Sequence, residues 1–189
     1  MRSPWIPCSL WTTIFAISLS LLGSLSHASP QSAMVSAASI VKPQAYVSLQ
    51  PVPRGKEFQV AVVAEIARGY HVNSHKPADA YLIPTTVTPQ LPAGFQLVDT
   101  IYPDGKLETF AFSPDKPLDV YTGSVTLRLR ITVQADATLG STTIPFTLRY
   151  QACSESTCLP PVKVPVAVKL DVAAANVSAR PLHPEIFIK

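Results

Sequence analysis

The chain is poor in glycine, in charge and in cysteine, and each scarcity excludes a class of function. It has seven glycines among 189 residues and no glycine-rich phosphate loop, which argues against nucleotide binding. Charged residues make up 14% of the chain, and its 15 lysines and arginines form no cluster. Nucleic acid and anionic membranes are therefore poor candidates for partners. The Gly-x-Ser-x-Gly and His-Glu-x-x-His motifs of hydrolases and metalloproteases are absent as well.

Residues 1–28 have the features of an export signal. Arg2 is their only formally charged residue, an apolar stretch follows at about residues 10–25, and the segment ends on small residues. The apolar stretch is shorter than the ~20 residues that a spanning helix needs, so cleavage is favoured over a retained anchor. Cys8 precedes this stretch rather than following it, which excludes a lipid anchor there. We expect a signal peptide at 1–28, a linker at 29–41, and a periplasmic or secreted protein.

The pattern of the remaining chain is that of an all-β protein. Nineteen prolines, spread along the chain, are hard to reconcile with long helices. In residues 124–133 (SVTLRLRITV) apolar residues alternate with threonine and arginine, so one face of this strand is buried and the other is wet. Such alternation is typical of an antiparallel sandwich or barrel. Between turn residues, the expected strands are residues 45–49, 58–66, 85–88, 95–98, 124–133, 144–152 and 162–172.

Seven to nine such strands predict an immunoglobulin-like antiparallel β-sandwich over residues 42–172. Pro165 has no N–H to donate, so the strand at 162–172 should lie at a sheet edge or bulge at this residue. Residues 173–189 lack strong patterning and are expected to form a loose C-terminal tail. The length suits one domain rather than two, and we expect a monomer.

Without the leader, Cys153 and Cys158 are the only two cysteines, and an oxidising compartment permits a disulfide between them. Five extended steps would span roughly 17 Å, whereas bonded cysteines have Cα atoms about 4.4–6.8 Å apart. The chain must therefore reverse between them, as in a four-residue hairpin loop. Closing so short a ring contributes only about 2 kcal/mol in the entropic model. The residues alone leave redox exchange and a structural bridge equally open.

Nothing in the sequence activates either thiol strongly. No helix N-terminus is predicted near the pair, and Glu155 in the intervening loop would disfavour a thiolate. We expect the other loop residues to be solvated turn residues, and any exchange to be slow without a docked partner.

Two histidines raise the possibility of a metal site. His71 and His75 lie four positions apart, and imidazole binds copper or zinc. Only two ligands are evident, however, so we favour structural histidines and expect neither a metal nor another cofactor.

Several blocks of sequence accompany the cysteine motif: RGYHVNSHKP at 68–77, YLIPT at 81–85, YP at 102–103 and VYTG at 120–123. Together with YQACSESTCLPP at 150–161, they resemble the periplasmic N-terminal domain of the thiol:disulfide interchange protein DsbD family. The resemblance spans about residues 41–172, and Tyr-Gln-x-Cys…Cys-x-Pro-Pro is its most specific part.

The resemblance implies an immunoglobulin-like oxidoreductase domain with Cys153 and Cys158 as its catalytic pair. Such a domain relays electrons from a membrane-embedded partner, by way of a thioredoxin-like domain, to oxidised client proteins of the periplasm. By analogy, Cys158 would form the mixed disulfide and Cys153 would resolve it. Full-length relatives continue into a transmembrane region, whereas this chain ends at Lys189, so we expect a separate membrane electron transporter. The alternative is a non-catalytic binding module with an inert hairpin disulfide.

The sequence departs from the family at the site itself. The loop between the cysteines is somewhat longer in the best-known relatives, and an aromatic cap loop shields the pair there. Phe110, Phe112 and Tyr121 are the candidates for such cover here, with packing in the core or in a hairpin as the favoured interpretation of each.

Overall fold

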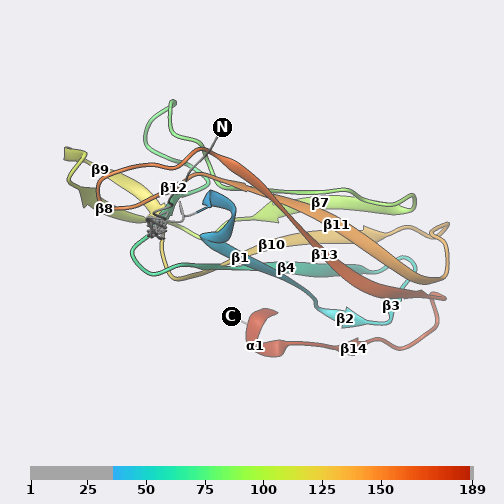
Figure 1. Ribbon diagram of the computed structural model, residues 1–189. Helices are drawn as coiled ribbons and strands as arrows, with labels where there is room; N and C mark the ends of the chain where they lie inside the picture. The colour runs from blue at the N-terminus through green and yellow to red at the C-terminus, as the bar shows by residue number, and fades with distance from the viewer. Residues whose placement is uncertain (1–35, 188–189) are drawn as a thin grey trace, which may run out of the picture. The chain divides into compact units, whose positions relative to one another are not determined.

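The computed structural model describes residues 36–187, and the signal peptide predicted at 1–28 lies outside them. Strands account for most of the regular structure (Figure 1). The elements, in chain order, are η1 (Ala37–Ser39), β1 (Val41–Val47), β2 (Leu49–Gln50), β3 (Val52–Pro53), β4 (Glu57–Ile66), β5 (His71–Asn73), β6 (Thr86–Pro89), β7 (Phe95–Ile101), β8 (Lys106–Phe110), β9 (Ser113–Tyr121), β10 (Ser124–Val133), β11 (Gly140–Tyr150), β12 (Ala152–Cys153), β13 (Val162–Ala173), β14 (Arg180–Pro181) and α1 (Pro184–Phe187).

Two four-stranded sheets form the layers of a sandwich, with strand orders β1-β4-β10-β7 and β3-β13-β11-β6. All neighbours in them are antiparallel except β3 and β13. One core joins the two sheets, since Val60 and Leu129 of the first and Ile144 and Leu170 of the second belong to the same buried cluster. The immunoglobulin-like β-sandwich predicted from the sequence is confirmed.

Alternation along β10 shows why this sequence forms that sandwich. Leu127, Leu129 and Ile131 are fully buried, while Arg128 and Arg130 between them are partly exposed. A strand with a period of two presents its apolar residues to one face only. The bounds predicted for this strand, residues 124–133, are those of β10.

Pro165 lies in the part of β13 that pairs with a strand on one side only. The strand pairs with β11 from Val162 to Val172, and Pro165 is opposite Thr147 in that pairing. On its other side β13 pairs with β3 only at Val172 and Ala173. Within residues 36–187, no strand therefore pairs with β13 at Pro165 on that side, in agreement with the edge position predicted for it.

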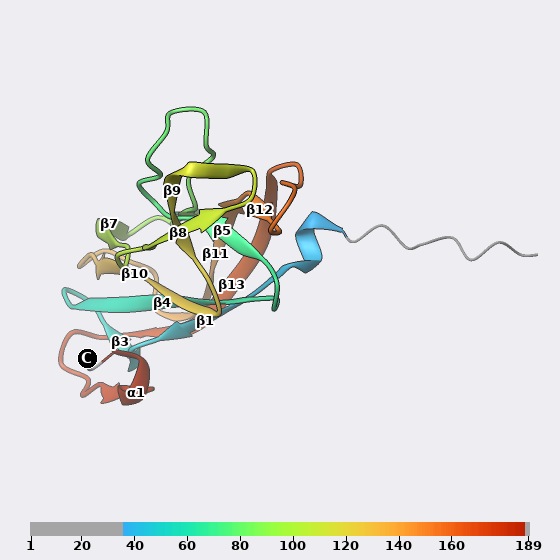
Figure 2. The same cartoon turned by 90° about the vertical axis from the view of Figure 1, so that its left-hand side faces the viewer.

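A third sheet, β12-β5-β9-β8, carries the cysteine loop at one end of the sandwich (Figures 1 and 2). Tyr150, at the end of β11, is fully buried, and its hydroxyl donates a hydrogen bond of 2.8 Å to the Ala37 carbonyl oxygen. This anchor fixes the chain two residues before β12. The core thus determines where the cysteine loop begins.

The C-terminal segment after β13, predicted as a loose tail, runs back over the outer side of the first sheet. β14 pairs with β2, and the Arg128 guanidinium on β10 donates to the Ile186 carbonyl oxygen, 2.6 Å from Nη2. The segment explains why Ala61, on the outward face of β4, is fully buried, because α1 contacts β4. Within residues 36–187, no helix has the length and hydrophobicity needed to cross a membrane.

Candidate active site

Cys153 and Cys158 face each other across a tight hairpin that follows β12. They form a β-bridge, their Cα atoms are 3.9 Å apart, and their sulfurs are bonded. A backbone hydrogen bond of 2.8 Å flanks the pair on each side: Leu159 N–H to the Ala152 carbonyl oxygen, and Ser154 N–H to the Thr157 carbonyl oxygen. This is the non-hydrogen-bonded type of antiparallel pair, which brings opposite side chains closest. The chain reversal predicted from the spacing is present.

The loop between the cysteines is closed by Ser154. Its Oγ accepts hydrogen bonds from the N–H groups of Ser156 and Thr157 at 3.4 and 3.3 Å. Serine closes turns in this way because its short side chain reaches backbone groups two or three residues ahead. Glu155, at the tip, is exposed to solvent. The four loop residues therefore make up the turn, and the only charged group among them is the exposed carboxylate of Glu155.

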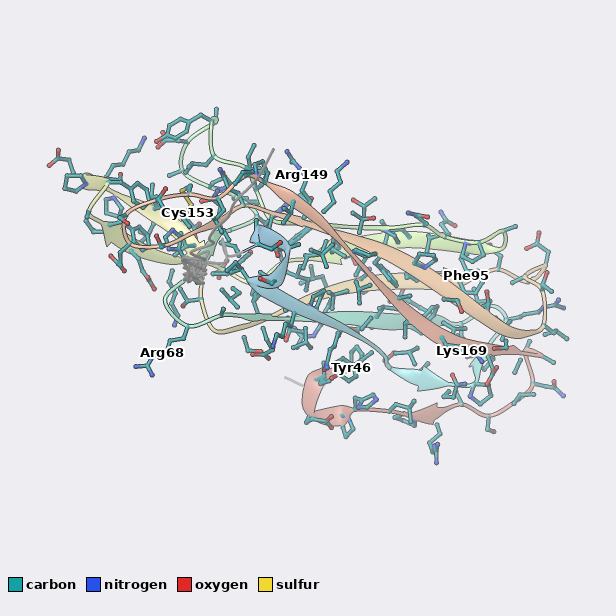
Figure 3. The ribbon with its side chains drawn as sticks, viewed as in Figure 1. Tyr46, Arg68, Phe95, Arg149, Cys153 and Lys169 are labelled. Carbon is teal, nitrogen blue, oxygen red and sulfur yellow. A yellow bond between two sulfur atoms is a disulfide. The ribbon has the colours of Figure 1, made fainter. Side chains whose placement is uncertain are left out.

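The two cysteines differ sharply in exposure. Cys153 is 1% exposed, whereas Cys158 falls among the exposed residues of the chain. Figure 3 shows Cys153 at the end of the sandwich where β8 and β9 lie. A thiolate from another protein must approach a disulfide sulfur directly, so access favours attack at Cys158.

An aromatic stack begins at the residue opposite Cys153. Cys153 lies opposite His71 in the pairing of β12 with β5. The His71 ring stacks on Phe110, with 3.9 Å between ring centroids and an interplanar angle of 20°. Phe110 stacks in turn on Phe112 at 5.5 Å. We call His71, Phe110 and Phe112 the aromatic stack. It runs from the neighbour of Cys153 to the exposed turn between β8 and β9.

Burial controls the charge of His71. Its side chain is 3% exposed, and this burial lowers its pKa from 6.5 to about 4, because an imidazolium without solvent is destabilised. The ring is therefore neutral at neutral pH. Its buried Nε2 atom has no hydrogen-bond partner within residues 36–187.

The three aromatic candidates for cover separate into two groups. Phe110 is buried and Phe112 is 40% exposed, and both belong to the aromatic stack beside Cys153. Tyr121 organises a different corner: its hydroxyl donates to the Pro103 carbonyl oxygen at 2.8 Å and accepts from the His75 N–H at 3.2 Å. Burial raises the pKa of Tyr121, so its phenol is neutral and serves as a structural anchor.

The two histidines considered as metal ligands belong to separate aromatic contacts. His71 stacks on Phe110, and His75 stacks on Tyr102 with 3.6 Å between centroids. No group of three or more histidine, cysteine, aspartate or glutamate residues placed to hold a metal occurs in the described part of the chain. The position of His71 opposite Cys153 is not predicted from the sequence. No sequence signal gives this, because the register of two very short strands is set by the rest of the fold.

The described residues form a β-sandwich that carries a disulfide in a hairpin at one end, with one cysteine exposed and the other buried. The sequence model of the family described as "Thiol:disulfide interchange protein DsbD, N-terminal" matches residues 37–170. The chain belongs to this family, which carries a disulfide and transfers electrons in thiol–disulfide exchange. The resemblance seen in the sequence is thereby confirmed.

Solved structures similar to this chain include two from Neisseria meningitidis. The reduced DsbD N-terminal domain is 18% identical and has a TM-score of 0.45, with 78% of this chain and 94% of that chain covered. A complex between the DsbD and PilB N-terminal domains is 16% identical and has a TM-score of 0.40, with 70% and 85% covered. The N-terminal periplasmic domain of ScsB from Proteus mirabilis is 14% identical and has a TM-score of 0.43, with 72% and 48% covered. No curated protein sequence matches the chain.

Proposed function

We propose that this protein is an exported thiol–disulfide relay of the periplasm, in which Cys153 and Cys158 pass electrons to oxidised client proteins. The cysteine motif lies within the residues that match the family, and the family's chemistry needs one reversible disulfide. The observation that carries the proposal is the unequal exposure of the pair, with Cys153 buried and Cys158 exposed. Such a pair offers one sulfur to a partner and keeps the other for resolution.

The reaction has two halves. In the first, a donor thiolate attacks Sγ of Cys158, the Cys153–Cys158 bond breaks, and its electron pair leaves on Sγ of Cys153. The second donor thiol then attacks the donor sulfur of the mixed disulfide, which oxidises the donor and releases Cys158 as a thiolate. In the second half, Cys158 attacks a client disulfide. Cys153 then attacks Sγ of Cys158, which restores the bond and releases the client as a dithiol.

A thioredoxin-like protein or domain is the partner we infer, supplied with electrons by a membrane-embedded transporter. One similar solved structure is a complex with another protein's N-terminal domain, which supports docking as part of the function. Docking has to supply much of the rate here, because the charged residue of the loop, Glu155, disfavours a thiolate beside it. Exchange with small thiols should accordingly be slow.

Trapping of a mixed disulfide tests the roles of the two cysteines. Cys153→Ala should accumulate a mixed disulfide with oxidised client proteins, because Cys158 remains accessible and Cys153, the thiol that would resolve this adduct, is absent. Cys158→Ala is the matched control and should accumulate little. The opposite result would exchange the two roles, and no adduct with either variant would contradict a relay.

The reduction potential of the pair decides between a relay and the inert clip of a binding module. Equilibration with glutathione and thioredoxin buffers should give a value between about −200 and −270 mV, the range of known exchange proteins. A value below about −300 mV would be that of a structural disulfide, and the binding module would then replace the relay.

A further inference from the structure

His71 is a buried imidazole that the exchange reaction described above leaves without a role. Its side chain is 3% exposed, and its Nε2 atom has no hydrogen-bond partner within residues 36–187. Leaving a buried polar atom unpaired costs about 1–3 kcal/mol. Most buried polar atoms in folded proteins are paired, so an unpaired one beside a redox-active group calls for a functional explanation.

The neighbour of His71 on the next strand is Cys153. The two residues lie directly opposite each other in the antiparallel pairing of β5 with β12. Opposite side chains in such a pair lie on the same face, with Cβ atoms about 4.5–5.5 Å apart. In the oxidised protein the sulfur of Cys153 is bonded to Cys158 and has no hydrogen to donate. Reduction gives this sulfur a proton on the face of the sheet that the imidazole also occupies.

Stacking holds the imidazole in place for such a contact. Phe110 lies nearly parallel to it at 3.9 Å, and Phe112 extends the stack toward solvent. Because the His71 ring is neutral, one of its two nitrogens is a hydrogen-bond acceptor. A fixed, neutral imidazole beside a buried thiol is therefore equipped to accept a hydrogen bond from it.

We propose that His71 is a positioning residue for Cys153: its Nε2 accepts a hydrogen bond from the Cys153 thiol in the reduced protein and is unpaired in the oxidised one. The bond stabilises the reduced form, since it satisfies the buried nitrogen only after the disulfide has opened. It also orients the resolving sulfur. The inference rests on the proposed function of the pair as an exchange couple.

The redox step balances as follows. A donor dithiol is oxidised to a disulfide and supplies two electrons and two protons, the Cys153–Cys158 bond breaks, and each Sγ ends as a thiol. The proton on Cys153 is the one shared with Nε2 of His71. When a client disulfide reoxidises the pair, the Cys153–Cys158 bond forms again, and the client sulfurs take the two electrons and two protons.

The variant His71→Phe tests this inference through the thiol–disulfide equilibrium with glutathione. Phenylalanine keeps an aromatic ring on Phe110 but removes the nitrogen. The equilibrium constant for reduction should fall about tenfold, which corresponds to a potential about 30 mV more negative.

His75→Phe is the matched control: His75 also stacks on an aromatic ring and has an unpaired nitrogen within the described residues, but it does not lie opposite a cysteine. It should stay within about twofold of wild type. An equally small change in His71→Phe would overturn the inference.

A measurement on the unaltered protein does not depend on how well a variant folds. The ¹⁵N resonance of Nε2 in His71 should shift between the oxidised and the reduced protein, because imidazole nitrogens report hydrogen bonding, whereas the ring nitrogens of His75 should change little. An unchanged His71 resonance would contradict the inference whatever the variants show.

Failure of the relay and failure of this inference give different results. If glutathione and thioredoxin do not open the disulfide, the proposed relay is wrong. A strong dithiol such as dithiothreitol still opens the bond in that case, and the effect of His71 can then be read from the equilibrium with this reagent and from the nitrogen resonance.

Discussion

Acid should destabilise this fold through one residue, His71. The His71 side chain is 3% exposed, and burial lowers its pKa from 6.5 to about 4. The imidazole of the unfolded chain therefore binds a proton more readily than that of the folded protein. Above about pH 6.5 the imidazole is neutral in both states and protonation costs the fold nothing; as the pH falls below 6.5 the unfolded state gains protons first, and the resulting loss of stability is complete below about pH 4.

The size of the effect follows from the size of the shift. At about 1.4 kcal/mol per pKa unit, lowering the pKa from 6.5 to about 4 corresponds to ~3 kcal/mol in the free energy of unfolding. About 2 kcal/mol of this should be lost between about pH 7.5 and about pH 5, where the unfolded imidazole is mostly protonated and the folded one mostly neutral.

Urea unfolding of the oxidised protein at these two pH values measures the loss. Wild type is compared with His71→Phe, so that the contributions of other titrating groups cancel in the difference. Wild type should lose about 2 kcal/mol more than the variant on acidification. His75→Phe, which leaves His71 intact, should follow wild type. Equal losses in wild type and His71→Phe, within about 0.5 kcal/mol, would refute the account of His71 as a buried neutral imidazole.

Two further substitutions test packing outside the cysteine loop. Gly105→Ala places a Cβ in steric conflict with Oδ1 of Asp119 and 2.9 Å from Cβ of Ser74, so thermal denaturation should show a loss of about 1–3 kcal/mol; an unchanged melting temperature would contradict this close packing. Arg128→Ala removes the hydrogen bonds to the Ile186 carbonyl oxygen. Amide hydrogen exchange in residues 180–187 should become faster while β10 stays protected, and equal protection of the segment in both proteins would show that this contact does not hold it.

Regular alternation, rather than length alone, decides which strands of this protein could be predicted from the sequence. The nine-residue β9, which holds two prolines, is not among the predicted strands, whereas the four-residue β6 corresponds to the strand predicted at 85–88. The apolar alternation in β10 runs over ten residues, and its predicted and observed bounds agree. β5 has three residues and β12 has two, too few to display a period of two. Such strands form because the longer sheets bring them together, so their existence depends on contacts distant in sequence rather than on local preference.

The same distinction holds at the cysteine loop. The chain reversal between Cys153 and Cys158 follows from local geometry, because two cysteines so close in sequence cannot bond across an extended segment. The burial of Cys153 and its pairing with His71 depend instead on β5 packing beside β12. The metal hypothesis paired His71 with His75, which lies close to it in the sequence. In the fold, the residue opposite His71 is Cys153 of β12, which is distant in the sequence.

The position of the disulfide itself favours exchange over a structural role. The ring it closes is small, so it contributes only about 2 kcal/mol, against about 5–15 kcal/mol for the total stability of a typical domain. The core between the sheets, with Leu129, Ile144 and Phe146 fully buried, is built without it. A bond that contributes little can open and close while the sandwich stays folded, and a relay has to do this in every cycle. A disulfide serving mainly to stabilise the fold would be expected to join the two sheets, whereas this one closes a loop and one of its two cysteines is exposed to solvent.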